Sequence, residues 1–139
     1  MGMDCVAVNP KSSEYRSASA NWSGWSYLMD LISQLGVSMD GVTGSNDGDL
    51  VKAGVAKKMG FALEGALKGG AVLEIETEDK SYSGGYKTTP IVSSIAQDEK
   101  VIREIVARKG VLHPVNERTK AWLRGWAEFL INCGGFRQC

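Results

Sequence analysis

Three glutamates at alternate positions are the residues of this chain best placed to act together. Glu74, Glu76 and Glu78 lie in and just after a segment, residues 71–77, where apolar residues alternate with them. This alternation is typical of a strand with one apolar and one polar face, on which neighbouring carboxylates stand about 6.5–7 Å apart. Such a row resembles the phosphates of a nucleic-acid strand, and Asp79 extends it. We expect either a surface that recognises a basic groove or a solvated strand face, the more common role of a charge run.

Aromatic residues near this row are candidates for the centre of a binding surface. Tyr82 and Tyr86 flank the turn that follows the acidic strand, whereas Trp22 opens a helix and is expected, with Tyr15 and Tyr27, to be partly exposed. Tyrosine and tryptophan are favoured at interfaces because they bury a large area and keep a polar group. The sequence therefore predicts these partner-binding residues: Glu74, Glu76, Glu78, Asp79, Tyr82, Tyr86 and Trp22.

Nucleophilic catalysis would need His113, the only histidine, beside a cysteine or serine. Cys133 and Cys139 qualify by residue type, but nothing in the sequence brings either of them to the imidazole. His113 precedes Pro114 in a short linker, which favours a surface or helix-flanking role. The chain has no G-x-S-x-G, Walker A, H-E-x-x-H or G-x-G-x-x-G pattern. We therefore assign no catalytic residue.

Neither the aspartates nor the cysteines have the spacing of a metal site. The acidic residues of the glycine-rich loop over 37–48 and its flank lack the order of an EF-hand: Asp40, Asp47 and Asp49. The cysteines are odd in number and form no C-x-x-C pair: Cys5, Cys133 and Cys139. We expect loop and capping roles for the aspartates, reduced and buried thiols, and no metal or cofactor.

The charge balance argues against direct, sequence-independent binding of nucleic acid. Lys and Arg together number 16, as do Asp and Glu, so the net charge is zero and the chain as a whole is not basic. No apolar run is long enough to span a bilayer, and the N-terminus has no signal-peptide pattern. We expect a cytoplasmic protein with residues 1–139 in a single domain. The oligomeric state stays open.

Periodicity predicts about four helices and a small two- or three-stranded sheet, an α+β fold. Helices are expected from Asn21 or Ser23 to about 35, and over 49–68, 97–109 and 115–133. Strands are expected over 3–8 and 71–77, paired in one sheet, with a proline-interrupted edge strand over 86–94. The polar stretch 11–20 is expected to be a loop.

Two further features of the helices bear on packing. Gly54 and Gly65 lie nearly on one face of the second helix, where another backbone is expected to approach closely. Apolar residues of the last helix recur on one face: Trp122, Trp126, Phe129, Leu130 and Cys133. Gly134 is expected in the left-handed conformation that ends a helix, with Phe136 folding back. The chain end should therefore join the core, and the first and last helices should pack through their tryptophans.

Both ends of the chain carry distinctive motifs. The opening has Met1-Gly2-Met3-Asp4, Asn9-Pro10, Trp22 and Trp25, and the end has Trp126, Phe129, Cys133, Gly134, Gly135, Phe136 and Cys139. These motifs resemble those of a family of small phage and prophage proteins that have no assigned activity. The alanine- and leucine-rich helix over 50–69 is also similar. The chain departs from the family pattern at Cys5-Val6-Ala7 in place of V-Y-G, at Cys133 in place of serine and at Gln138 in place of isoleucine. The resemblance implies a phage setting and a shared fold, not a mechanism.

Two classes of function remain open. The first is a non-enzymatic binding protein of phage type that occludes a protein of the bacterial host, with a defence component such as a CRISPR effector as the foremost partner. The second is a small enzyme or nucleotide-binding protein that uses Cys133 or His113 with the carboxylates. A deep pocket with convergent polar groups and a perturbed titratable residue would favour the second, and a broad exposed patch the first.

Overall fold

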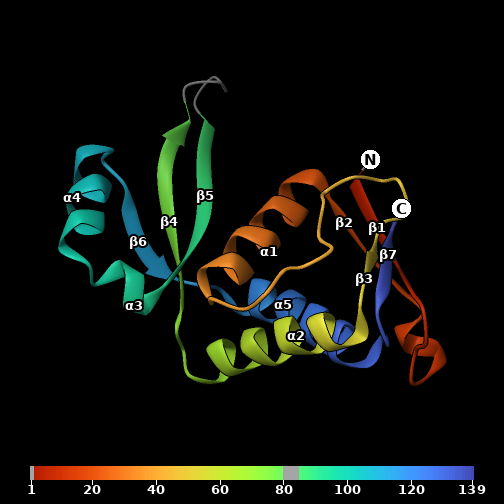
Figure 1. Ribbon diagram of the computed structural model, residues 1–139. Helices are drawn as coiled ribbons and strands as arrows, with labels where there is room; N and C mark the ends of the chain where they lie inside the picture. Colours follow the sequence, from red (N-terminus) through yellow and green to blue (C-terminus); the bar gives the residue numbers. More distant parts are fainter. Residues whose placement is uncertain (1, 80–84) are drawn as a thin grey trace.

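The computed structural model describes residues 2–79 and 85–139 and confirms the α+β class. Among these residues, four α-helices have nine residues or more, as expected. Figure 1 shows the elements in the order β1 (Gly2–Ala7), η1 (Ser13–Tyr15), β2 (Ser17–Asn21), α1 (Trp22–Gln34), β3 (Leu50–Val51), α2 (Ala53–Lys68), β4 (Val72–Asp79), β5 (Gly85–Val92), α3 (Ser93–Ala96), α4 (Glu99–Ala107), β6 (Val111–Pro114), α5 (Glu117–Asn132) and β7 (Phe136–Gln138).

The strands form two antiparallel sheets, so the prediction that the first strand and residues 71–77 share one sheet is wrong. The first sheet has the order β2-β1-β7-β3 and the second the order β5-β4-β6. The stretch expected as a loop supplies β2, in which Ala18 and Ala20 stand opposite Cys5 and Met3 of β1. Small side chains at these positions leave room for the buried residues of β1. The backbone of β1 bonds to β2 on one side and to β7 on the other, so it does not need a strand of the second sheet.

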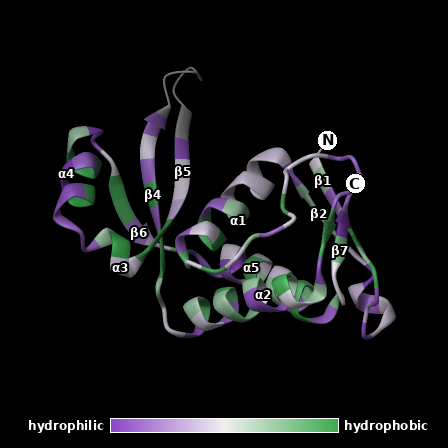
Figure 2. Cartoon of the chain, in the orientation of Figure 1, coloured by the Kyte–Doolittle hydropathy of each residue, from purple (hydrophilic) through white to green (hydrophobic). Residues whose placement is uncertain are grey.

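Helices α1, α2 and α5 lie between the two sheets (Figures 1 and 2), and buried apolar residues of all three belong to one core cluster. Trp25 of α1 and Trp126 of α5 meet edge to face, with ring centroids 5.9 Å apart. Both are buried in the main hydrophobic core. The prediction that the first and last long helices pack through their tryptophans is confirmed.

A glycine does bring α2 and α5 close together, but it is Gly60. A Cβ atom there would lie 2.8 Å from the carbonyl oxygen of Ala127 and 2.8 Å from Cγ1 of Ile131. At Gly54 and Gly65 no atom of the described residues lies within 4 Å of such an atom. The prediction for these two glycines is therefore wrong, because the approach is on the face that Gly60 shares with buried Ala56, Met59 and Leu63.

The chain end joins the core as expected, and it also forms a strand. Gly134 and Gly135 have φ angles of +68° and +92°, which turn the chain back after α5. The ring of Phe136 then lies with its centroid 6.1 Å from that of Phe129. Strand β7 pairs with both β1 and β3, and β3 takes residues 50–51, where the sequence pattern predicts the start of the second helix.

Helix α4 covers the apolar face of the second sheet. Ile75 and Thr77 of β4 line one small cavity together with Val101 and Ile105 of α4. Since side chains alternate along a strand, the glutamates of β4 must point to the opposite face, toward α1 and α5. Among the described residues, no helix combines the length and apolar character needed to cross a lipid bilayer.

Candidate functional site

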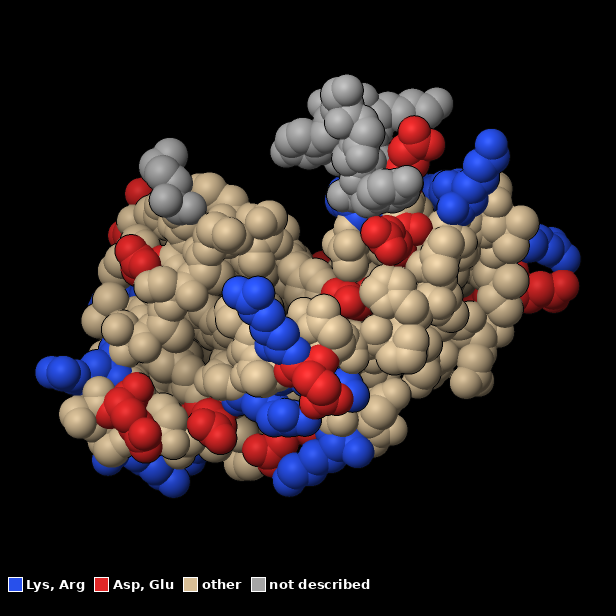
Figure 3. Space-filling view, turned by 180° about the vertical axis from the view of Figure 1, so that it is seen from behind, with Lys and Arg blue, Asp and Glu red and all other residues tan. Residues whose placement is uncertain are grey.

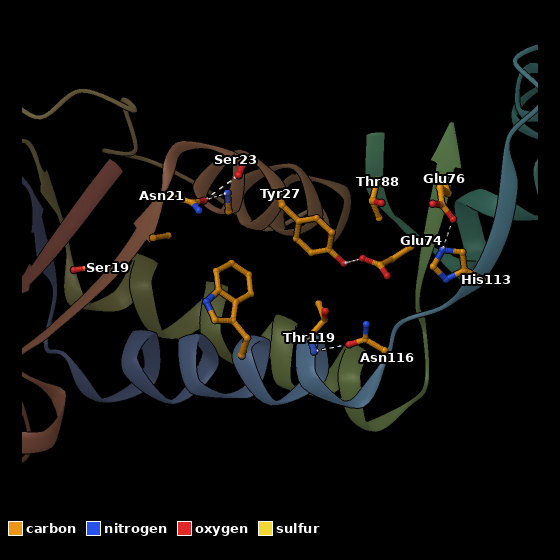
Figure 4. A pocket seen from close by; sticks show the side chains of 13 residues that line it. Ser19, Asn21, Ser23, Tyr27, Glu74, Glu76, Thr88, His113, Asn116 and Thr119 are labelled. Atoms are coloured by element: carbon orange, nitrogen blue, oxygen red, sulfur yellow. Dashed lines mark hydrogen bonds and ion pairs between the residues drawn. The ribbon is translucent and has the colours of Figure 1, made fainter. Parts of the chain in front are cut away.

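A cleft of about 660 Å³ lies between the second sheet and the N-terminal halves of α1 and α5. Its walls come from the end of β2, the first turns of α1, strands β4, β5 and β6, and the start of α5 (Figure 4). This volume is within the range of small-ligand sites. From behind, the molecule is notched beside the β4–β5 hairpin, with acidic side chains on the hairpin's wall (Figure 3).

The acidic row lies on one strand face as predicted, but it is not a solvated face along its whole length. Glu74 is only 6% exposed, the side chain of Glu76 is 43% exposed, and Glu78 is exposed. The expectation of an exposed Glu74 is wrong because α1 covers the base of β4. Asp79 is the last residue of β4 and Tyr86 the second of β5, but their side chains, like all of Tyr82, lie outside the described residues.

Glu74 is held at the base of the cleft by a tyrosine. The hydroxyl of Tyr27 donates a hydrogen bond of 2.8 Å to Oε2 of Glu74. Burial, reinforced by this bond and by the negative charge of Glu74, raises the pKa of Tyr27 well above its usual range, so the phenol stays protonated. Within the described part of the chain, Oε1 of Glu74 has no hydrogen-bond partner. No side-chain oxygen among these residues is both fully buried and unpaired, so Oε1 must be in contact with solvent. We conclude that Oε1 faces the cleft that Glu74 lines.

His113 belongs to the wall of the same cleft. It lies in the edge strand β6, paired in register with Glu74, and its Nε2 is 3.8 Å from Oε2 of Glu76. Its Nδ1 is 3.0 Å from the carbonyl oxygen of Pro114. His113 thus belongs to a strand and its imidazole is half-exposed, whereas the sequence predicts a linker at the surface.

Cys133 cannot act with His113. The two residues flank α5, whose 16 residues span about 24 Å at 1.5 Å per residue. The Cys133 thiol is buried, donates to the carbonyl oxygen of Leu130 at 3.5 Å, and has its pKa raised by burial. Cys139 lies beside β1, where its backbone exchanges two hydrogen bonds with Asp4. Neither cysteine can supply the nucleophile that a dyad with His113 requires.

Two aromatic rings stand over the base of the cleft. Trp122 and Tyr27 meet edge to face with centroids 6.4 Å apart, and both line the cleft. A Cβ atom at Gly24 would lie 3.3 Å from the Trp122 ring, so this glycine makes room for it. Trp22, the predicted aromatic contact, is 39% exposed but does not line the cleft. Sequence reasoning assigned Trp122 to the core because its helical spacing matches that of Trp126.

Asparagines cap both helices that open on the cleft. Oδ1 of Asn21 accepts from the amide of Gly24 at 2.7 Å, and Oδ1 of Asn116 accepts from the amide of Thr119 at 2.8 Å. The first was one of two predicted caps. Because a cap fixes where a helix begins, Asn21 and Asn116 set the positions of Tyr27 and Trp122 along their helices.

The remaining polar clusters serve the loops. Asp49 accepts from Thr43 Oγ1 at 2.7 Å and Asp47 from Ser45 Oγ at 2.5 Å, which confirms loop roles for these two aspartates. Within residues 2–79 and 85–139, no three His, Cys, Asp or Glu side chains are grouped so that they could share a metal ion.

Comparisons of the chain with protein-family models, with curated proteins and with solved structures found no match. Function must therefore be inferred from the cleft itself.

Proposed function

We propose that this is a non-enzymatic binding protein that engages a basic segment of a partner protein in its cleft. The observation that carries the proposal is the composition of the cleft. Glu74 and Glu76 line it together with the rings of Tyr27 and Trp122, and its described lining contains no Lys or Arg. A recess that is acidic and aromatic favours a cationic, partly apolar group over an anion.

Local charge is the only charge that can steer such a partner. With a net charge of zero the molecule has no long-range field of one sign. The row from Glu78 at the rim to Glu74 at the base would draw a basic group inward and fix its position. Aromatic rings at the base are placed where binding energy is usually concentrated, in the desolvated centre of an interface.

The resemblance of the chain ends to phage and prophage proteins suggests a partner from the bacterial host cytoplasm. Proteins that bind nucleic acid have basic grooves. A nucleic-acid-binding defence component, such as a CRISPR effector, is therefore the partner that this proposal favours, with the protein acting as an inhibitor that occludes the groove.

Charge reversal at the rim tests the proposal. Glu76→Lys with Glu78→Lys leaves the buried Glu74 in place, so the Tyr27 bond is retained. Affinity capture from a bacterial host lysate should recover a partner with the native protein and about tenfold less with this variant. The matched control reverses two exposed carboxylates outside the cleft, Glu104→Lys with Glu128→Lys, and should capture as well as the native protein. Equal capture by both variants would overturn the proposal.

One observation favours an enzyme as the second candidate. His113 and Glu76 stand 3.8 Å apart in an open cleft, an arrangement in which an imidazole can act as a general base. This candidate predicts that His113→Ala abolishes turnover of a small ester or phosphodiester. The binding proposal predicts that the same variant has no turnover to lose and still captures the partner.

A further inference from the structure

We infer that the group received at the base of the cleft is the guanidinium of a partner's arginine, bridging Glu74 and Glu76 against the ring of Trp122. This inference rests on the proposed function and names the chemical group that the cleft recognises. Four features of the described residues lead to it: a buried carboxylate, a second carboxylate at strand spacing, an aromatic wall and the lack of a resident cation.

The buried carboxylate is the anchor. Glu74 is 6% exposed, and among the described residues only Oε2 has a hydrogen-bond partner, the hydroxyl of Tyr27. A carboxylate removed from water is stabilised only when its lone pairs are satisfied or a cation pairs with it. Oε1 faces the cleft and is left for a donor from outside.

A second acceptor lies two residues along the same strand. Glu74 and Glu76 share one face of β4, so their side chains are about 6.5–7 Å apart. A planar guanidinium carries five N–H donors on a rigid fork and can bond to two acceptors at once, whereas an ammonium acts as a point charge. The pair of carboxylates therefore favours arginine over lysine.

The aromatic wall suits the same group. Trp122 is fixed from two directions, by the backbone of Gly24 and by the ring of Tyr27. A guanidinium stacks on an indole face through cation–π attraction and dispersion, and is less strongly hydrated than an ammonium. Both effects add to the preference for arginine.

The resident groups do not compete strongly for the carboxylates. No Lys or Arg belongs to the described lining, and His113 stays 3.8 Å from Glu76, which is too long for a hydrogen bond. The cleft, at about 660 Å³, has room for the residues flanking the arginine as well as its side chain. A surface loop of a partner protein therefore fits better than an isolated small cation.

The test uses single blocked amino acids and the native chain. Nα-acetyl-arginine amide, Nα-acetyl-lysine amide and Nα-acetyl-citrulline amide are titrated while amide and indole NMR shifts are followed. We expect arginine to shift the Trp122 indole and the Glu74 and Glu76 amides, lysine to bind about tenfold more weakly, and the uncharged citrulline not to bind. Equal binding of arginine and citrulline, or no shift at the cleft, would overturn the inference.

Variants locate the contact. Glu74→Gln and Glu76→Gln should each weaken arginine binding about tenfold, because each removes a charge from a charge-assisted hydrogen bond. Glu76→Gln guards against a folding defect, since Glu76 is half-exposed and Glu74 is not. Glu104→Gln, on the far side of the sheet, is the matched control and should bind arginine normally. Unchanged binding by both cleft variants would contradict the assignment.

Failure of this inference alone and failure of the proposed function give different results. If cleft variants abolish partner capture but arginine amide does not bind, the inference fails and the proposed function stands. If arginine amide binds but rim reversal leaves capture intact, the proposed function fails, and the inference of a partner's arginine fails with it. Free L-arginine should bind no more tightly than the blocked amide. If free L-arginine bound about tenfold more tightly than the blocked amide, the ligand would be the free amino acid and the assignment to a partner's side chain would be overturned.

Discussion

Tyr27 of α1 and Glu74 of β4 are joined by a hydrogen bond of 2.8 Å across the base of the cleft (Figure 4). A second link lies at the C-terminal end of α1. There Gln34 donates to the carbonyl oxygen of Pro90 at 2.9 Å and accepts from the amide of Val92 at 3.0 Å. Helix α1 thus holds the second sheet at two levels. The width of the cleft is set by these side-chain bonds.

The Tyr27 bond should make stability depend on alkaline pH. Burial raises the pKa of Tyr27, so in the folded protein the phenol stays neutral while in the unfolded chain it ionises near pH 10. The stabilisation that the neutral Tyr27 phenol contributes to the folded protein is therefore fully present below about pH 10. It is lost as pH rises further, because the phenol then ionises more readily in the unfolded chain. Tyr27→Phe should lower the free energy of unfolding at neutral pH by about 2 kcal/mol, because the bond that it removes is made to a carboxylate. Above about pH 10 the free energy of unfolding of Tyr27→Phe should also fall less steeply with pH than that of the native protein, as denaturant titration would show.

Tyr15→Phe is the matched control. Tyr15 is not bonded to Glu74, so this variant should keep the neutral-pH stability of the native protein. Burial, reinforced by the neighbouring Glu14, also raises the pKa of Tyr15, so the alkaline slope of this variant should be shallower than that of the native protein, but by less than for Tyr27→Phe. Identical alkaline slopes for Tyr27→Phe and the native chain would contradict the role given to the buried phenol.

The three cysteines should differ sharply in reactivity. Cys5 and Cys133 are buried and Cys139 is exposed. Burial, reinforced by nearby negative groups, raises the pKa of Cys5 to about 12, and burial also raises that of Cys133, so neither forms the reactive thiolate near neutral pH. A thiol reagent should label one site in the folded protein and three in denaturant. Cys139→Ser should remove the fast site, and fast labelling that survives this change would contradict the assignment.

Gly60 and Gly65 form a matched pair on α2. Gly60→Ala places a methyl 2.8 Å from the Ala127 carbonyl oxygen and should destabilise the protein by about 1–3 kcal/mol, since the backbone of α5 cannot give way cheaply. Gly65→Ala places its methyl where no atom from the described part of the chain lies within 4 Å, and it should stabilise the protein by up to about 1 kcal/mol through helix propensity. Thermal or denaturant unfolding measures both. Equal effects of the same sign would contradict the packing of α2 on α5.

Local patterns predict what depends on neighbours in sequence. The face of α5 that holds Trp126, Phe129 and Leu130 follows from helical spacing, and the left-handed Gly134 from its place at the helix end. The shared face of Glu74, Glu76 and Glu78 follows from strand alternation. These features need no knowledge of the remaining fold.

Features that depend on distant segments could not be predicted in the same way. Alternation assigns Glu74 to a face, but only the packing of α1 against the second sheet shows that the face is covered. Strand β7 is three residues long, and it forms because β1 and β3 offer edges on both sides. His113 and Trp122 lie near each other in sequence, yet they share a site only because β6 leads directly into α5 beside the cleft.

Gln138 should control the order of the loop over 41–49. Its side chain is fully buried, accepts from the amides of Thr43 and Gly44 at 3.1 and 3.2 Å, and donates to the carbonyl oxygens of Gly41 and Asp49 at 2.9 and 3.3 Å. Gln138→Ile has a similar volume but removes all four bonds, and each unsatisfied buried group costs about 1–3 kcal/mol. Because Thr43 and Gly44 are exposed and water can replace their bonds, we expect a loss near the lower end of that range. Hydrogen exchange should accelerate at the amides of Thr43 and Gly44 and stay slow in α5.

Gln138→Glu is the matched variant, since a carboxylate keeps the acceptor for these amides but cannot donate to the carbonyl oxygens. It should retain more protection at Thr43 and Gly44 than Gln138→Ile, and equal exchange in the native protein and Gln138→Ile would show that the loop is held by its own contacts.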